Sequence, residues 1–281
     1  MNEVDENIAI KIDVNKAFKD KNPGLYRILP KFIFYFLKRL IHQKELNRIF
    51  ESSKDLYNIE FIDNFLRLMN IKYEVEGIEK VPKNGRYIFV SNHPIGAIEG
   101  IILISVIGKN FNNGIKSVAN DLLMNIHNLQ DVFIPVNKHG QQTREYIKTL
   151  NEFYSSDTQI TIFPAGLVSR KIDGIVQDLE WQKSFISKAI KYKRDIVPIY
   201  IDGINSNFFY NFSRIRKMLG IKTNLDMFLL PHESFMQKGK TIKLIFGEKF
   251  SYEHFDKSCS HKEWAAKMRK QVYSLKTNID N

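Results

Sequence analysis

A histidine and a glutamate six residues apart carry the first chemistry that the sequence suggests. The segment Tyr87–Ser91 has the pattern of a buried strand, and Asn92 and His93 follow it directly. Loops at strand ends are where α/β folds present reactive side chains. Across a glycine-containing turn, Glu99 can curl back and accept the Nδ1 proton of the imidazole, which leaves Nε2 free as a base. We therefore predict a His93–Glu99 dyad. The alternative is a histidine that satisfies a buried turn beside an acid at a helix start.

A second strand exit lies at the run Phe163-Pro164-Ala165-Gly166, with Arg170 four residues further on. Backbone N–H groups freed around Gly166, together with the Arg170 guanidinium, would suit a phosphate or a developing oxyanion. Taken alone, this is an ordinary strand exit.

A third strand, 132–136, is followed by Lys138 and, at the start of the next helical run, by Arg144. Helix N-termini with basic side chains bind anions. Lys138 and Arg144 are therefore predicted to contact an anionic substrate, with plain surface charges as the alternative.

The elements that must position these residues indicate an α/β fold. Residues 15–70 carry apolar side chains at helical spacing, and from residue 71 onward short β-rich runs alternate with helical ones. The expected strands are 73–77, 87–91, 115–119, 132–136, 159–163, 196–201 and 241–246. This alternation predicts a mixed, largely parallel sheet flanked by helices. We expect an N-terminal helical extension over 1–70 and one catalytic domain over 71–281.

The composition narrows the partners. The chain has 42 Lys and Arg against 31 Asp and Glu, a formal net charge of +11, which favours an acidic partner such as anionic lipid, nucleic acid or an acidic carrier protein. The alternative is that the excess of positive charge only aids solubility. The single cysteine, Cys259, excludes an internal disulfide and is consistent with a reducing compartment. No apolar run reaches the ~20 residues of a spanning helix, and the N-terminus lacks a secretory signal pattern.

The three strand exits, in this order, resemble the signature of the glycerolipid and lysophospholipid acyltransferase family, in which 1-acylglycerol-3-phosphate acyltransferases are typical members. The matching blocks are Asn92-His93 to Glu99, Ile134 to Arg144, Phe163 to Gly166, and the proline-containing strand 196–200. The resemblance covers about residues 71 to 205. The commonest form of the family has four residues between His and an Asp, and has Glu in place of Ala165. The motifs as they stand in this chain are similar to those of a bacterial branch of the family. That branch is labelled haemolysin and is related to the acyltransferases of ornithine and glycine lipids.

This resemblance implies an O-acyltransferase. His93 would take the proton of an acceptor hydroxyl, which then attacks the thioester of an acyl carrier protein or coenzyme A donor, while Glu99 orients the imidazole. Asn92 would shape the turn. Phe163, Pro164, Gly166, Arg170, Lys138 and Arg144 would form the binding surface for donor or acceptor. The acceptor would be a lyso-lipid, either lysophosphatidic acid or a lyso-amino-acid lipid. The acyl donor would be a co-substrate, and we expect no metal and no resident cofactor.

A lipid acceptor implies attachment to a membrane surface, and we expect a cytoplasmic protein peripheral on the inner face of the membrane. The segments 25–40 and 208–219 combine aromatic residues with cations, as interfacial helices do. Helices that face the core and expose a basic side to solvent would show the same pattern. The basic run 183–194 could dock an acidic carrier protein or be solvated. Two rival functions stay open: a hydrolase that uses the same dyad, and a nucleic-acid-binding protein, which no recognition motif supports.

Overall fold

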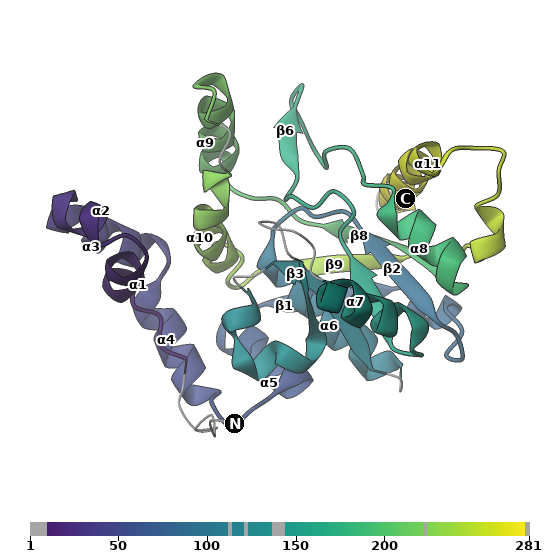
Figure 1. Cartoon of the computed structure of the whole chain (residues 1–281), viewed down its shortest axis with the longest axis horizontal. Coiled ribbons are helices and arrows are strands. Elements are labelled where there is room, and N and C mark those ends of the chain that lie inside the picture. Colours follow the sequence, from purple (N-terminus) through teal and green to yellow (C-terminus); the bar gives the residue numbers. More distant parts are fainter. Residues whose placement is uncertain (1–9, 112–113, 121–122, 137–143, 222–223, 279–281) are drawn as a thin grey trace.

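The computed structural model describes residues 10–111, 114–120, 123–136, 144–221 and 224–278 (Figure 1). The α-helices are α1 (Val14–Lys21), α2 (Pro23–Ile28), α3 (Lys31–Leu40), α4 (Gln43–Ser52), α5 (Asn58–Leu68), α6 (Ala97–Asn110), α7 (Arg144–Ser155), α8 (Ser184–Tyr192), α9 (Asn207–Met218), α10 (Leu230–Phe235) and α11 (His261–Ser274). The strands are β1 (Lys72–Glu76), β2 (Tyr87–Ser91), β3 (Ile115–Asn120), β4 (Phe133–Val136), β5 (Gln159–Ile162), β6 (Arg170–Ile172), β7 (Ile175–Gln177), β8 (Asp195–Asp202) and β9 (Thr241–Phe246).

Seven strands form one mixed sheet in the order β1-β9-β8-β2-β5-β3-β4. The five strands from β8 to β4 are mutually parallel, and β9 joins β8 in the antiparallel sense while pairing in parallel with β1. The carboxyl ends of β2, β5 and β8 therefore meet at one edge of the sheet. Parallel α/β sheets bind their ligands at this edge.

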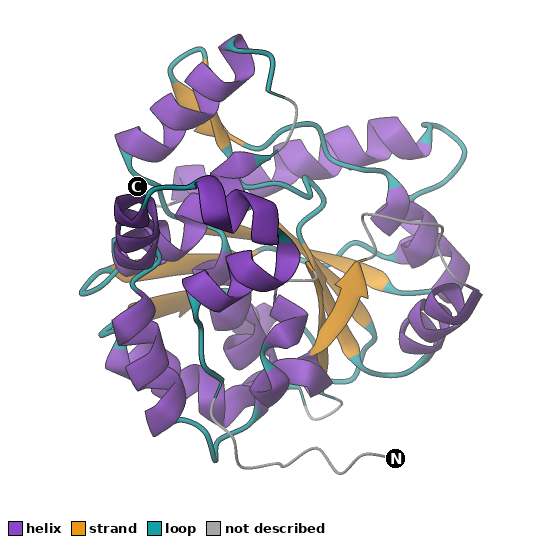
Figure 2. Ribbon diagram, turned by 60° about the vertical axis from the view of Figure 1, so that its left-hand side comes forward, coloured by secondary structure: helices purple, strands orange, loops and turns teal. Residues whose placement is uncertain are grey.

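Helices cover both faces of the sheet (Figure 2), which explains why β2 is buried along its whole length. On one face, α5 and α6 pack over strand residues such as Phe89 and Val197. On the other face, α8 and α11 pack over Ile88, Val90 and Ile196. Strands covered on both faces read as continuous apolar runs, and this is why the central strands could be recognised in the sequence.

The helices α1 to α4 form an arm beside the sheet (Figure 1). At the corner between α3 and α4, His42 packs against α10. Its ring stacks on Phe235 at 4.1 Å, and its Nε2 lies 3.1 Å from Nδ1 of His232. The next helix, α5, buries Phe61 and Ile62 in the same core as the sheet. Among the described residues, no helix is both long and apolar enough to cross a membrane.

The predicted fold class is confirmed. Each of the seven expected strands is present, with ends that differ by one residue at most, and the helical N-terminal segment is found as α1 to α5. The boundary between an extension and a catalytic domain at residue 70 stays a prediction, since α5 shares the core of the sheet. The short β6–β7 hairpin was not predicted from the sequence; it turns at Asp173 and Gly174, both with positive φ.

Candidate active site

The His93 imidazole and the Glu99 carboxylate meet at the carboxyl end of β2. Nδ1 of His93 lies 2.9 Å from Oε1 of Glu99. His93 retains 17% side-chain exposure, whereas Glu99 is completely buried. A hydrogen bond at Nδ1 to a carboxylate selects the tautomer that carries its proton on Nδ1, so that Nε2 presents a lone pair. The arrangement leaves Nε2 able to accept a proton, on a side chain that is mostly buried.

Helix α6 holds the Glu99 carboxylate in place. Glu99 is the third residue of the helix, and its Oε1 also accepts hydrogen bonds from the N–H groups of Ile95 and Gly96, at 2.9 and 2.7 Å. A carboxylate in the first turn of a helix is stabilised by the unpaired N–H groups and by the helix dipole. Gly96 has φ of +130°, a conformation open to glycine, and a Cβ atom there would press on Leu230. The turn therefore requires this glycine.

Phe163 fixes the plane of the imidazole from the next strand. The Phe163 and His93 rings stack with centroids 4.2 Å apart and an interplanar angle of 22°. Phe163 follows β5, which pairs with β2, so the sheet register itself sets this contact. With Glu99 on Nδ1 and Phe163 on the ring face, both side-chain torsions of His93 are constrained.

The main chain of His93 is held by two further residues. The N–H group of His93 donates to Oδ1 of Asp178 at 3.1 Å, and the carbonyl of His93 accepts from the backbone N–H group of Ser169 at 2.7 Å. Asp178 is 1% exposed. No sequence pattern pointed to Asp178, because a single acid in a loop has no spacing that marks it.

Asn92 is buried and braces the turn. Its Nδ2 donates to the carbonyl of Ile201, and its Oδ1 accepts from the N–H group of the same residue, at 2.9 and 2.8 Å. The amide thus ties the end of β2 to the end of β8. This geometry fits the turn-shaping role that the resemblance implies, and it leaves the substrate contact of Asn92 a prediction.

Arg170 lies in a buried ion-pair cluster. Its guanidinium binds Oδ2 of Asp226 at 2.8 Å, and Arg216 binds the same carboxylate from α9, also at 2.8 Å. Burial lowers the pKa of Arg170, and Asp226 opposes that shift. Two cations share one anion, so the cluster keeps one positive charge in excess. Arg170 is therefore already paired within the protein, and its role toward an anionic substrate stays a prediction.

The loop after β5 closes on itself more than the sequence suggests. The N–H group of Gly166, which has φ of +65°, donates to the carbonyl of Phe163 at 2.9 Å. This N–H group is not free for an oxyanion, because the strand exit forms a hydrogen-bonded turn. Pro164 is buried beneath it. Lys138 lies outside the described residues, and Arg144 is described only as the first residue of α7.

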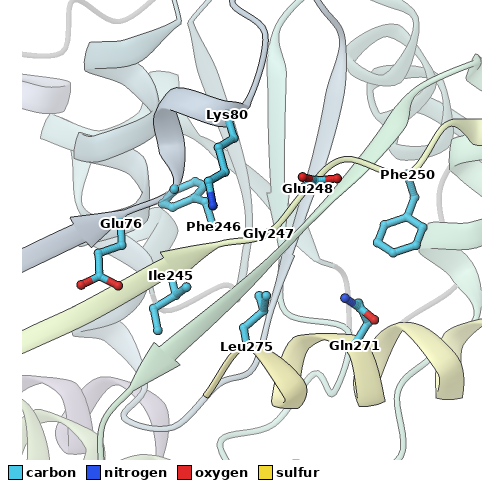
Figure 3. A pocket seen from close by; sticks show the side chains of 10 residues that line it. Glu76, Lys80, Ile245, Phe246, Gly247, Glu248, Phe250, Gln271 and Leu275 are labelled. Carbon is cyan, nitrogen blue, oxygen red and sulfur yellow. The ribbon is translucent and has the colours of Figure 1, made fainter. Parts of the chain in front are cut away.

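Pockets border the described part of the sheet at opposite ends of its strands. One of them, of about 500 Å³, is lined by Asn92 and Pro94, which flank His93 in the chain, and by Lys240 and Lys276. Figure 3 shows another, of about 400 Å³, where Glu76 and Lys80 face Gln271 and Leu275. This second pocket lies at the carboxyl ends of β1 and β9. Because β9 runs opposite to β8, it is at the far edge from His93.

Comparisons with known proteins identify the family of this chain. The acyltransferase family model matches residues 16–281. The chain is 42% identical over 264 residues to a lyso-glycine lipid O-acyltransferase of Bacteroides thetaiotaomicron, covering 94% of this chain and 97% of that protein. It is 40% identical, over 94% of this chain and 95% of the relative, to a lyso-glycine lipid O-acyltransferase of Phocaeicola vulgatus. This chain therefore belongs to the acyltransferase family, and it is an enzyme that transfers acyl groups.

The fold has a solved counterpart. The crystal structure of the 1-acyl-sn-glycerophosphate (LPA) acyltransferase PlsC from Thermotoga maritima superimposes with a TM-score of 0.50, covering 93% of this chain and 95% of that one. The sequence identity is 15%, so this likeness concerns the fold alone. The expected acyltransferase architecture, a mixed and mostly parallel sheet with N-terminal helices, is thereby confirmed.

Proposed function

We propose that this enzyme moves a fatty acyl group from a thioester donor to the hydroxyl group of a lyso-lipid, with His93 as the general base. The observation that carries the proposal is the hydrogen bond between Nδ1 of His93 and the buried Glu99 carboxylate. This bond favours the tautomer with its proton on Nδ1, so that Nε2 carries the lone pair that a general base needs. The names of the two relatives favour a lyso-glycine lipid as acceptor.

The reaction needs no covalent intermediate on the protein. Nε2 of His93 takes the proton of the acceptor hydroxyl as its oxygen attacks the thioester carbonyl. The C–S bond then breaks, and the imidazolium returns the proton to the departing thiolate. Glu99 stabilises the imidazolium while it exists. Base catalysis of this kind accelerates a reaction by ~10²- to 10⁴-fold, and the remainder comes from positioning and charge stabilisation. An acyl carrier protein and coenzyme A are both suitable donors.

A membrane surface is the proposed location of the acceptor, on the inner face of the cytoplasmic membrane. Ile28, Phe32, Tyr35 and Phe36 recur at helical spacing along α2 and α3, and each is more than half exposed. Lys31 and Arg39 accompany them. An apolar stripe flanked by cations suits an anionic lipid surface.

A second set of exposed apolar side chains lies on α9 and at its C-cap: Phe208, Ile215, Met218 and Leu219. The cations Arg214 and Lys217 lie beside them and are exposed. These side chains extend the proposed contact with lipid to the part of the chain that follows β8.

The experiment that tests the proposal is an acyl-transfer assay with labelled acyl carrier protein or acyl-CoA and a panel of lyso-lipids, including lyso-glycine lipid and lysophosphatidic acid. We expect a diacylated product from wild type and none from His93→Ala. His261→Ala is the control, because His261 binds Ser187 on the outside of α11. Free fatty acid as the only product, dependent on His93, would show a hydrolase and overturn the proposal.

A further inference from the structure

The main chain of His93 is held on both sides of its Cα atom, and one buried acid organises that support. Asp178 accepts the N–H group of His93 on Oδ1 at 3.1 Å. The same Oδ1 accepts the hydroxyl of Ser169 at 2.5 Å, and Oδ2 accepts Nε1–H of Trp181 at 2.8 Å. Three donors on one carboxylate compensate for its burial.

Ser169 links this acid to the other peptide group of His93. Its N–H group donates to the His93 carbonyl at 2.7 Å, while its hydroxyl has both that carbonyl and Asp178 within reach. A hydroxyl has one proton to donate, and the shorter contact is the one to the carboxylate. Asp178 and Ser169 together bracket the two backbone torsions of His93.

The C-terminal helix α11 anchors Asp178 itself. The N–H group of Asp178 donates to the hydroxyl of Tyr273 at 2.8 Å, and its carbonyl accepts from Arg269 at 2.7 Å. Burial and the Asp178 charge both raise the pKa of Tyr273. The residues that hold His93 are thus connected to α11, which packs on the face of the sheet opposite α6.

We infer that Asp178 is a positioning residue for His93, which fixes its main chain so that Nε2 faces the acceptor hydroxyl. The inference rests on the proposed function. Glu99 and Phe163 constrain only the side-chain torsions of His93. These torsions determine the position of Nε2 only if the backbone of His93 is also fixed. Displacement of a reacting group by 1 Å can cost about 10²-fold in rate.

The variant Asp178→Asn should remove the hydrogen bond to the N–H group of His93 while keeping a buried side chain of nearly the same shape at this position. An asparagine has one oxygen and one NH₂ group, and it cannot accept from both His93 and Trp181. Turned with its NH₂ group toward Ser169, it keeps the bond with Trp181 and loses the bond with His93. We expect kcat to fall about 10²-fold, with KM for both substrates unchanged.

Removing the competing donor should restore the activity. In Asp178→Asn/Trp181→Phe the amide oxygen has no partner on the Trp181 side, so it turns back to the N–H group of His93. We expect kcat of the double variant to exceed that of Asp178→Asn, although it carries one substitution more. Trp181→Phe alone is the matched control and should keep most of the wild-type kcat. An acid needed only for folding predicts no such rescue.

A spectroscopic readout makes the test independent of turnover. In protein labelled with ¹⁵N-histidine, the His93 imidazole signals are identified by their loss in His93→Gln. We expect these signals to shift in Asp178→Asn and to return toward wild type in the double variant. Near-UV circular dichroism at the assay temperature verifies that each variant is folded. Should Asp178→Asn not fold, Ser169→Ala is the second variant, with about a tenfold lower kcat expected at unchanged KM.

The outcomes are distinguishable. An unchanged kcat in Asp178→Asn, or a double variant no more active than the single one, overturns the role of Asp178. Absence of transfer in wild type overturns the proposed function, while the imidazole signals still report on Asp178.

Discussion

Oε1 of Glu99 accepts hydrogen bonds from Nδ1 of His93 and from the N–H groups of Ile95 and Gly96, all within 2.7 to 2.9 Å. Glu99 is one methylene longer than the aspartate of the commonest family form. It reaches His93 across the five intervening residues because it lies in the first turn of α6 and its side chain folds back over that turn. The same carboxylate therefore caps the helix and orients the imidazole.

Glu99→Gln should lower kcat by about 10²-fold or more at unchanged KM, because the imidazolium loses its counter-charge. Steady-state acyl transfer measures this. Glu233→Gln is the matched control: Glu233 is equally buried and holds Ser206 at the start of α9, but no histidine. If Glu99→Gln kept wild-type kcat, the dyad would have no part in the reaction.

Phe32→Ser/Phe36→Ser should weaken binding to vesicles that contain anionic phospholipid, since the two aromatic rings are 71% and 56% exposed on α3. Co-sedimentation with phosphatidylglycerol vesicles, at low and high salt, measures the effect. Ile147→Ser, an exposed apolar position on α7, should bind as wild type does. Equal binding of all three proteins would exclude the arm from the membrane contact.

Arg194→Met should destabilise the fold by about 3 kcal/mol without lowering kcat per folded molecule. Arg194 is fully buried, and its guanidinium donates to backbone carbonyls around the end of α7, including those of Tyr154 and Thr158 at 2.8 Å. Burial lowers its pKa to about 10. Urea unfolding provides the measurement. Arg86→Met, a partly exposed neighbour bonded to two carbonyls, should cost clearly less.

Tyr210 should make stability depend on pH above 10. Burial raises the pKa of Tyr210 from 10.0 to about 12. Between these values the unfolded chain has lost the phenolic proton and the folded chain has kept it. Stability is therefore fully present below pH 10, and it falls as pH rises, by about 1.4 kcal/mol per unit. The stability difference between wild type and Tyr210→Phe should shrink accordingly in urea titrations from pH 8 to 11. A constant difference would contradict this assignment.

Local sequence patterns were enough to predict the elements of the fold and the contact between His93 and Glu99. Strands buried on both faces read as apolar runs of the right length, so β2, β5 and β8 were recognisable with nearly their final bounds. His93 and Glu99 were predictable because their contact lies within six residues, where a turn and a helix start control the geometry. The resemblance to acyltransferases supplied the reaction, since its blocks are local motifs.

The surroundings of that pair depend on contacts between segments that are far apart in the chain. Asp178 reaches His93 from 85 positions along the chain, and Asp226 reaches Arg170 from 56. Neither partner has a spacing that a linear pattern could reveal. Arg194 stood in a basic run that suggested a solvated or docking surface, yet it is buried and bonded to backbone carbonyls. Such contacts depend on the register of the sheet and on the packing of α11, and these are set when distant segments meet.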